Sequence, residues 1–177
     1  MSDTLPTLTT AQLVLRPFTL EDAPLVQRFA GNREVAANTT NIPHPYPDGA
    51  AEMWINSHAP LWAERQAMTL AITEREGGAL VGAIGLSITA TDRRAELGYW
   101  IGRPYWGRGF ATEAGRAMVD HGLGPLGLHR VMARHLARNP AYGRVMRKLG
   151  MTQEGVLRGH ALKWGVFEDI VVHAVLA

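Results

Sequence analysis

A glycine-containing loop between a predicted strand and a predicted helix offers the most specific chemistry in the chain. Residues 105–112 read Tyr-Trp-Gly-Arg-Gly-Phe-Ala-Thr. The first turn of a helix exposes backbone N–H groups that have no partner within the helix, and it lies at the positive end of the helix dipole. Glycine lets an anion come close to this backbone. The loop therefore predicts a binding site for phosphate groups.

Two other phosphate-binding motifs fit the loop poorly. A P-loop needs Gly-Lys followed by Ser or Thr, whereas this loop ends in Gly109-Phe110-Ala111. A dinucleotide-binding fold needs a third glycine or alanine at fixed spacing and an acidic residue at the end of the next strand. The predicted strand at 130–137 ends in His-Leu-Ala, without an acid. A purely structural role, in which the glycines only permit a tight turn, stays open.

Hydrophobic periodicity and turn residues define the elements around the loop. Asp22 or Thr19 is the expected N-cap of the first helix, which ends at Gly31, and Asp48 is the expected cap of the second, which Pro60 ends or kinks. Strands followed by helix–strand–helix crossovers predict a mixed α/β sheet with helices on both faces. We predict strands at 11–18, 67–73, 79–88, 95–101, 130–137, 153–158 and 166–176, and helices at 22–30, 48–60, 108–123 and 140–149, in a single domain spanning 1–177.

Charge is distributed unevenly along the chain. Residues 1–92 carry five basic and ten acidic side chains, whereas residues 93–177 carry thirteen and six, for a net charge of +2. A basic half can attract a polyphosphate ligand or nucleic acid, or it can be solvated surface charge. Neither a helix-turn-helix pattern nor interleaved aromatic and basic residues are present, so we expect no nucleic-acid partner.

The absence of cysteine excludes several functional classes. A disulfide framework, a thiolate metal site and a cysteine nucleophile all need a residue type that the chain lacks. We expect no metal cofactor. The N-terminus does not read as a signal peptide, and no apolar run approaches the ~18 residues of a membrane span. A cytoplasmic protein without a membrane partner is the expectation.

The loop resembles motif A of the GNAT superfamily of N-acetyltransferases, whose pattern is Gln/Arg-x-x-Gly-x-Gly/Ala. Trp106 stands at its first position, which is similar to the RimJ/RimL type, the branch that acetylates the N-termini of ribosomal proteins. Three further segments resemble parts of that branch. The opening strand corresponds to residues 13–17, the fourth strand to residues 96–101, and the asparagine-containing second motif to residues 139–151. The resemblance covers nearly the whole chain. It implies a mostly antiparallel sheet of about seven strands, splayed between the fourth and fifth; Gly98, inside a predicted strand, is a candidate bulge there.

The resemblance also implies acetyl-CoA as the cosubstrate. Its pantetheine arm would pair with the strand near Trp100 and Ile101, and Asn139 would contact it. Asn139 also reads as a helix N-cap before Pro140, which is compatible with that contact. The pyrophosphate would lie on the backbone of the motif-A loop, where Gly107 shapes the turn and the N–H groups belong to Arg108, Gly109, Phe110, Ala111 and Thr112.

The implied reaction is direct attack of a neutral amine on a thioester. Glu96 is the candidate base, acting through water, although it also fits an ordinary glutamate that faces solvent. Tyr142 stands where the RimL type usually has serine, while the tyrosine of other branches would fall at Met146. A phenol with a pKa of ~10 is protonated at neutral pH and could donate to the departing thiolate. Alternatively, the Tyr142 ring only packs over the pantetheine arm.

The acceptor site is expected in the N-terminal part. The proline-rich loop at 41–49 and the helix after it supply His44, Tyr46 and Trp54, which could equally be loop and core residues. The acidic N-terminal half suits a cationic amine. A protein N-terminus is the favoured acceptor. The alternative acceptor is a small amine, such as a polyamine, an amino acid or an amino-sugar antibiotic. The alternative function is that of a module that binds acyl-CoA without catalysis. We expect the protein to be a monomer or a homodimer.

Overall fold

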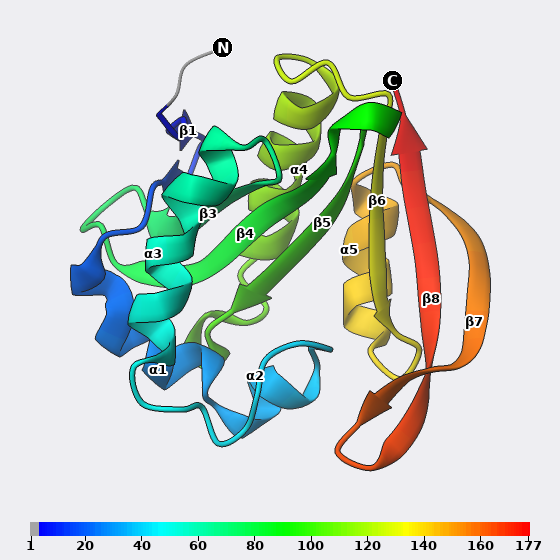
Figure 1. The fold of residues 1–177 in the computed structure, drawn as a ribbon, viewed down its shortest axis with the longest axis horizontal. Helices are drawn as coiled ribbons and strands as arrows, with labels where there is room; N and C mark the ends of the chain where they lie inside the picture. Colours follow the sequence, from blue (N-terminus) through cyan, green and yellow to red (C-terminus); the bar gives the residue numbers. More distant parts are fainter. Residues whose placement is uncertain (1–3) are drawn as a thin grey trace.

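The computed structural model describes residues 4–177, which form an eight-stranded mixed sheet flanked by helices (Figure 1). The spatial order of the strands is β1-β2-β3-β4-β5-β6-β8-β7. The strands are β1 (Leu8–Thr9), β2 (Leu13–Arg16), β3 (Ala67–Glu74), β4 (Leu80–Thr89), β5 (Arg94–Ile101), β6 (Arg130–Leu136), β7 (Thr152–Lys163) and β8 (Val166–Leu176). The helices are α1 (Ala23–Ala30), α2 (Arg33–Ala37), α3 (Ala50–Ala63), α4 (Phe110–Leu123) and α5 (Pro140–Lys148).

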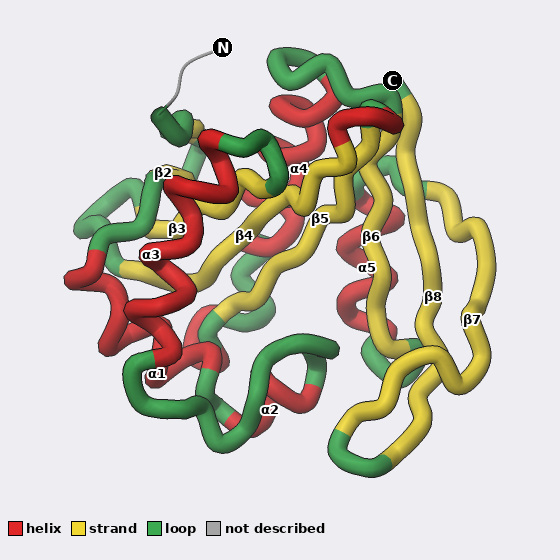
Figure 2. The backbone as a smooth tube through the Cα atoms, viewed as in Figure 1, coloured by secondary structure: helices red, strands yellow, loops and turns green. Residues whose placement is uncertain are grey.

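The sheet is antiparallel except where β5 meets β6. This parallel pairing covers only residues 94–97 of β5 and 130–133 of β6. Beyond it, β5 stays paired with β4 up to Ile101, and β6 stays paired with β8 up to Leu136. Each strand therefore keeps its outer neighbour while the two inner edges diverge, as the tube view in Figure 2 shows. The predicted splay is confirmed.

Two apolar clusters hold helices against the sheet. One joins the strands to α4 and α5 through residues such as Phe110, Met118 and Met146, all almost fully buried. The other joins α1, α2 and α3 to the sheet and includes Val26 and Trp100. Packing on both faces follows from strands that bury residues on both sides, as the central run of β3 and β4 does.

Two elements of the fold are absent from the sequence prediction. The sheet has eight strands rather than seven because β1, only two residues long, pairs with Leu15 and Val14 of β2. The helix α2 is five residues long and begins where the Asn32 side chain accepts hydrogen bonds from the backbone of Glu34 and Val35. Both are too short for periodicity to detect, because a periodic pattern needs several turns of helix or several alternating strand residues.

Two local predictions were wrong, and a third was wrong in one of its two alternatives. Gly49, with a φ of 76°, is the N-cap of α3, while the Asp48 carboxylate accepts a hydrogen bond from Gln27 instead. Pro60 does not end α3, which continues to Ala63, and the alternative that it kinks the helix stays a prediction. Gly98 is not a bulge, because it pairs opposite Gly85 in unbroken register. The splay therefore comes from the end of β5–β6 pairing rather than from an inserted residue.

Asp22 links strand β2 to the start of helix α1 through its hydrogen bonds. It precedes α1 as expected, but its carboxylate does not cap that helix. It accepts two hydrogen bonds from Arg16, at 2.8 and 2.9 Å, and one from the backbone of Thr19, at 2.9 Å. Burial alone would raise the pKa of Asp22, but these hydrogen bonds and the Arg16 charge outweigh burial and hold the pKa below its ordinary value.

We expect Asp22→Asn to lower the free energy of unfolding at pH 7 by about 1–3 kcal/mol, because the carboxylate that pairs with the half-buried Arg16 loses its charge. A carboxyl with a lowered folded-state pKa stabilises above its unfolded pKa and loses this effect as the pH falls through the folded value. The difference between the two proteins should therefore shrink below about pH 3.9. Urea unfolding from pH 7 to pH 3 measures it. Glu21→Gln, at an exposed neighbour, is the control, and a difference that persists at low pH would contradict the assignment.

Candidate active site

The motif-A loop has the geometry that an anion site requires. Gly107 and Gly109 have φ angles of 79° and 81°, in the left-handed region that favours glycine. Gly109 is the N-cap of α4, so the first backbone N–H groups of that helix point out of its start. A Cβ built on either glycine would meet nothing within 4 Å. The space beside the loop is therefore open to a ligand.

A cavity of about 470 Å³ lies between this loop, the end of β5 and the face of α5; we name it the donor cavity. Arg144 and Lys148 add positive charge to its lining. Arg108 does not line it, because its guanidinium binds Glu74 at 2.6 Å and lies over the Phe110 ring. All other residues expected to contact the cosubstrate do line it: Trp100, Ile101, Gly107, Gly109, Phe110, Ala111, Thr112 and Asn139.

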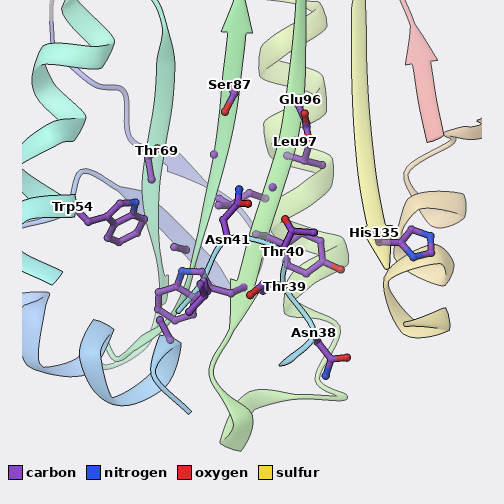
Figure 3. Close-up of a pocket in the computed structure, with 18 of the residues that line it drawn as sticks. Asn38, Thr39, Thr40, Asn41, Trp54, Thr69, Ser87, Glu96, Leu97 and His135 are labelled. Atoms are coloured by element: carbon purple, nitrogen blue, oxygen red, sulfur yellow. The ribbon is translucent and has the colours of Figure 1, made fainter. Parts of the chain in front are cut away.

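A second cavity of about 420 Å³, the acceptor cavity, lies against β3, β4, β5 and β6 (Figure 3). Tyr46 and Trp54 line it, as do Glu96 and segment 38–43, the loop after α2. His44 does not. It is exposed, with its Nδ1 3.1 Å from the Gly31 carbonyl oxygen, and its ring faces Trp164 in the β7–β8 turn.

The two cavities meet at Tyr142. The lining residues that they share are Asn38, Thr39, Tyr99, Trp100 and Tyr142. The Tyr142 ring stacks on Tyr99 of β5, with centroids 4.4 Å apart, and on His135 of β6, at 5.5 Å. It therefore lies between the diverging strands. Asn139 fixes the start of α5 below it, because its side chain accepts a hydrogen bond from the Tyr142 backbone at 3.3 Å.

The surroundings of Tyr142 keep its phenol protonated. Burial raises its pKa, the negative charge of Glu96 adds to the rise, and a backbone hydrogen bond at Tyr99 opposes it. The net effect is a pKa above the ordinary value, so the hydroxyl carries its proton throughout the neutral range. A group in this state can donate a proton at the junction of the two cavities but cannot act there as a base.

Glu96 lies on the acceptor-cavity side, and its partner is a residue that sequence reasoning missed. Nε and Nη2 of Arg134 donate to the two carboxylate oxygens of Glu96 at 2.9 and 2.8 Å. Both residues line the acceptor cavity, where they are the only Asp, Glu, Lys or Arg side chains of the described chain. Arg134 is a charged residue inside a predicted strand, which is the one signal that could have identified it.

Segment 38–43 also escaped prediction as part of the site. Three side chains from the C-terminal half donate to the chain around it. Arg138 binds the Ala37 carbonyl at 2.7 Å, Asn139 the Asn38 carbonyl at 3.5 Å, and Lys163 the Ile42 carbonyl at 3.0 Å. These contacts hold the polar segment against the splay. They join residues about a hundred or more positions apart, which no local pattern indicates.

Histidines pack behind Tyr142 without forming a metal site. His135 stacks on His173, and its Nδ1 lies 2.9 Å from the Leu136 carbonyl oxygen. Burial lowers the pKa of both rings. Over residues 4–177, no cluster of three or more His, Asp or Glu side chains could hold a metal ion. No helix in the same range is long and apolar enough to cross a membrane.

Comparison with known proteins agrees with this geometry. Residues 12–152 match the family described as the acetyltransferase (GNAT) domain. The chain is 32% identical to an uncharacterized N-acetyltransferase, p20, of Bacillus licheniformis, covering 96% of each chain. It is 27% identical to the [ribosomal protein uS5]-alanine N-acetyltransferase of Escherichia coli, covering 95% of this chain and 89% of that one. In fold it is similar to spermidine N-acetyltransferase from Vibrio cholerae in complex with CoA and spermine, with a TM-score of 0.82, 20% identity and coverage of 94% and 96%.

The family match spans most of the chain, and the first of these relatives aligns over nearly its full length. The splayed sheet, the open glycine loop at a helix start and the two joined cavities are the features that such an enzyme needs. The chain belongs to the GNAT family and is an acyl-CoA-dependent N-acetyltransferase.

Proposed function

We propose that this enzyme transfers an acetyl group from acetyl-CoA to the α-amine at a polypeptide N-terminus. The observation that carries the proposal is the meeting of the donor and acceptor cavities at Tyr99, Trp100 and Tyr142. A thioester entering from one side and an amine entering from the other would come together there. The nature of the acceptor follows from the charge of the second cavity.

The donor cavity fits coenzyme A. The N–H groups at the start of α4 would hold the pyrophosphate, and the open space at Gly107 and Gly109 lets it approach. Arg144 and Lys148 would offset the phosphate charge. On the side that faces β6, β5 has no paired strand beyond Leu97, and the pantetheine arm would lie along the strand there. The Ile101 carbonyl at the end of this strand accepts a hydrogen bond from Nε1 of Trp106. Bound acetyl-CoA supplies the activated acetyl group.

The acceptor cavity suits an amine with a single charge. Its lining carboxylate, Glu96, is already paired with Arg134, so the pair adds no net charge. A polyamine carries several charges and would need several unpaired carboxylates. The polar groups of segment 38–43 instead offer hydrogen bonds to a peptide backbone. The relative that acts on ribosomal protein uS5 supports this class of acceptor, whereas the spermidine enzyme supports the fold alone.

Proton transfer would involve two residues on opposite sides of the junction. Each Glu96 oxygen accepts one hydrogen bond from Arg134 and keeps a lone pair for water, so the carboxylate can take a proton from the amine through that water. The Tyr142 hydroxyl would give its proton to the departing sulfur. This arrangement suits an α-amine, because a group with a pKa of ~8 needs little help to lose its proton.

We expect a peptide with a free α-amine to be the better acceptor. Near pH 7 roughly a tenth of α-amines are neutral but under a thousandth of lysine side chains, so kcat/KM should favour the α-amine by about 100-fold. Initial rates of CoA release measure this. The matched comparison is the same peptide with a blocked N-terminus and one lysine. Spermidine is the third acceptor to be compared. A preference for either of these would contradict the proposal.

Acetyl-CoA should raise the melting temperature. At ~100 Kd it adds about 2.7 kcal/mol of stability, which is about 5–10 °C for a domain of this size. Gly109→Trp should abolish this rise by filling the open space at the loop. Gly127→Trp is the matched control, because Gly127 also has a positive φ and open space but lines neither cavity. A rise that survives in Gly109→Trp would place the cosubstrate elsewhere.

Tyr142→Phe should lower kcat by about 100-fold, because the departing sulfur loses its proton donor. The acetyl-CoA melting shift should be retained, since the ring and its stacking remain. Because burial raises the pKa of Tyr142, wild-type kcat should show no alkaline loss from this group below about pH 10. A pH profile of kcat measures this, and full kcat in Tyr142→Phe would rule out the donor role.

A further inference from the structure

We propose that Arg134 is a positioning residue, which holds the Glu96 carboxylate in the orientation that serves the acceptor amine. The proposal rests on the function proposed above, in which Glu96 accepts the proton of that amine. It adds a residue that does not touch the reacting atoms and acts only through Glu96. The position of the pair in the sheet, its bidentate geometry and its exposure all point to this role.

The pair lies at the apex of the splay. Glu96 is opposite Met132 in the short parallel ladder, and the ladder ends one residue later at Leu97 and Ala133. Arg134 is the first residue of β6 beyond that end. Its side chain therefore spans the gap at the point where backbone pairing stops. The same strands form the floor of the acceptor cavity, in which Figure 3 shows Glu96.

The ion pair with Arg134 fixes the orientation of the Glu96 carboxylate as well as balancing its charge. A glutamate side chain turns about three bonds and, alone at a cavity wall, would sample several rotamers. The planar guanidinium binds both oxygens at once, so it restricts the carboxylate to one plane. Lysine, with a single ammonium group, would keep the charge but lose this restriction.

Stability alone does not account for the pair. The side chains of Arg134 and Glu96 are 40% and 35% exposed. Ion pairs at such positions contribute little to folding, because water screens the charges and both side chains lose freedom. Burial is the main cause of the raised pKa of Tyr142, and the charge of Glu96 also contributes to it. The carboxylate therefore lies close enough to the cavity junction for its orientation to matter.

The chain offers a matched control on the same strand. Arg130 of β6 makes a bidentate ion pair with Glu154 of β7, and neither residue lines the donor or the acceptor cavity. The two pairs have the same chemistry and similar exposure but different places in the sheet. A general effect of removing an arginine from β6 should therefore appear in both Arg130→Met and Arg134→Met. An effect on catalysis should appear only in Arg134→Met.

The test is a double-mutant cycle with Arg134→Met and Glu96→Gln, measured as kcat and KM for a peptide acceptor at saturating acetyl-CoA. Arg134→Met should lower kcat by about 10- to 100-fold, the range expected for a misplaced catalytic group. It should have no further effect in the Glu96→Gln background. Arg134→Lys should recover only part of the rate, and Arg130→Met should keep the wild-type kcat. Melting with and without acetyl-CoA checks that each variant is folded.

Three outcomes would overturn the proposal in distinguishable ways. If Glu96→Gln is impaired and the losses multiply in the double variant, Arg134 does not act through Glu96, and only the positioning role fails. If Glu96→Gln keeps the wild-type kcat, the proton-accepting role of Glu96 in the proposed function fails, and the positioning role fails with it. A loss in Arg134→Met that appears only in KM for the acceptor would show direct binding of the acceptor, which also overturns the proposal.

Discussion

The backbone pairing between β5 and β6 ends at Leu97 and Ala133, and the site depends on that end. Each strand has an outer partner along its whole length, so the sheet remains intact while its middle opens. An opening of this kind exposes backbone groups that would be costly to bury without partners. A ligand that lies along the β5 edge can satisfy them. This explains why the two cavities meet where β5 and β6 part.

Aromatic rings fill part of the opening between β5 and β6. Tyr99, Tyr142, His135 and His173 form a stack that crosses from β5 over β6 to β8. Nε2 of His135 and both nitrogens of His173 are buried without a hydrogen-bond partner. Burial lowers the pKa of both histidines, so the stack is uncharged at neutral pH. An uncharged wall beside Tyr142 leaves Glu96 and Arg134 as the charged groups of the acceptor cavity.

The uneven charge of the two halves of the chain has a different meaning in three dimensions. Several basic side chains of the C-terminal half pair with acids of the N-terminal half, as Arg103 does with Glu34 and Arg108 with Glu74. These contacts join segments that flank the cavities. Arg144 and Lys148, in contrast, place positive charge in the lining of the donor cavity.

The sequence alone determined the glycine loop, the long strands and helices, and the family. These depend on local properties: glycine at positions with positive φ, a cap before Pro140, and hydrophobic periodicity within one element. Only the tertiary structure decided which residues meet. Arg134 pairs with Glu96, Tyr142 stacks between two strands, and His44 lies outside the lining of the acceptor cavity. Such contacts depend on strand register and on where two strands part, and both are set by packing between segments far apart in the chain.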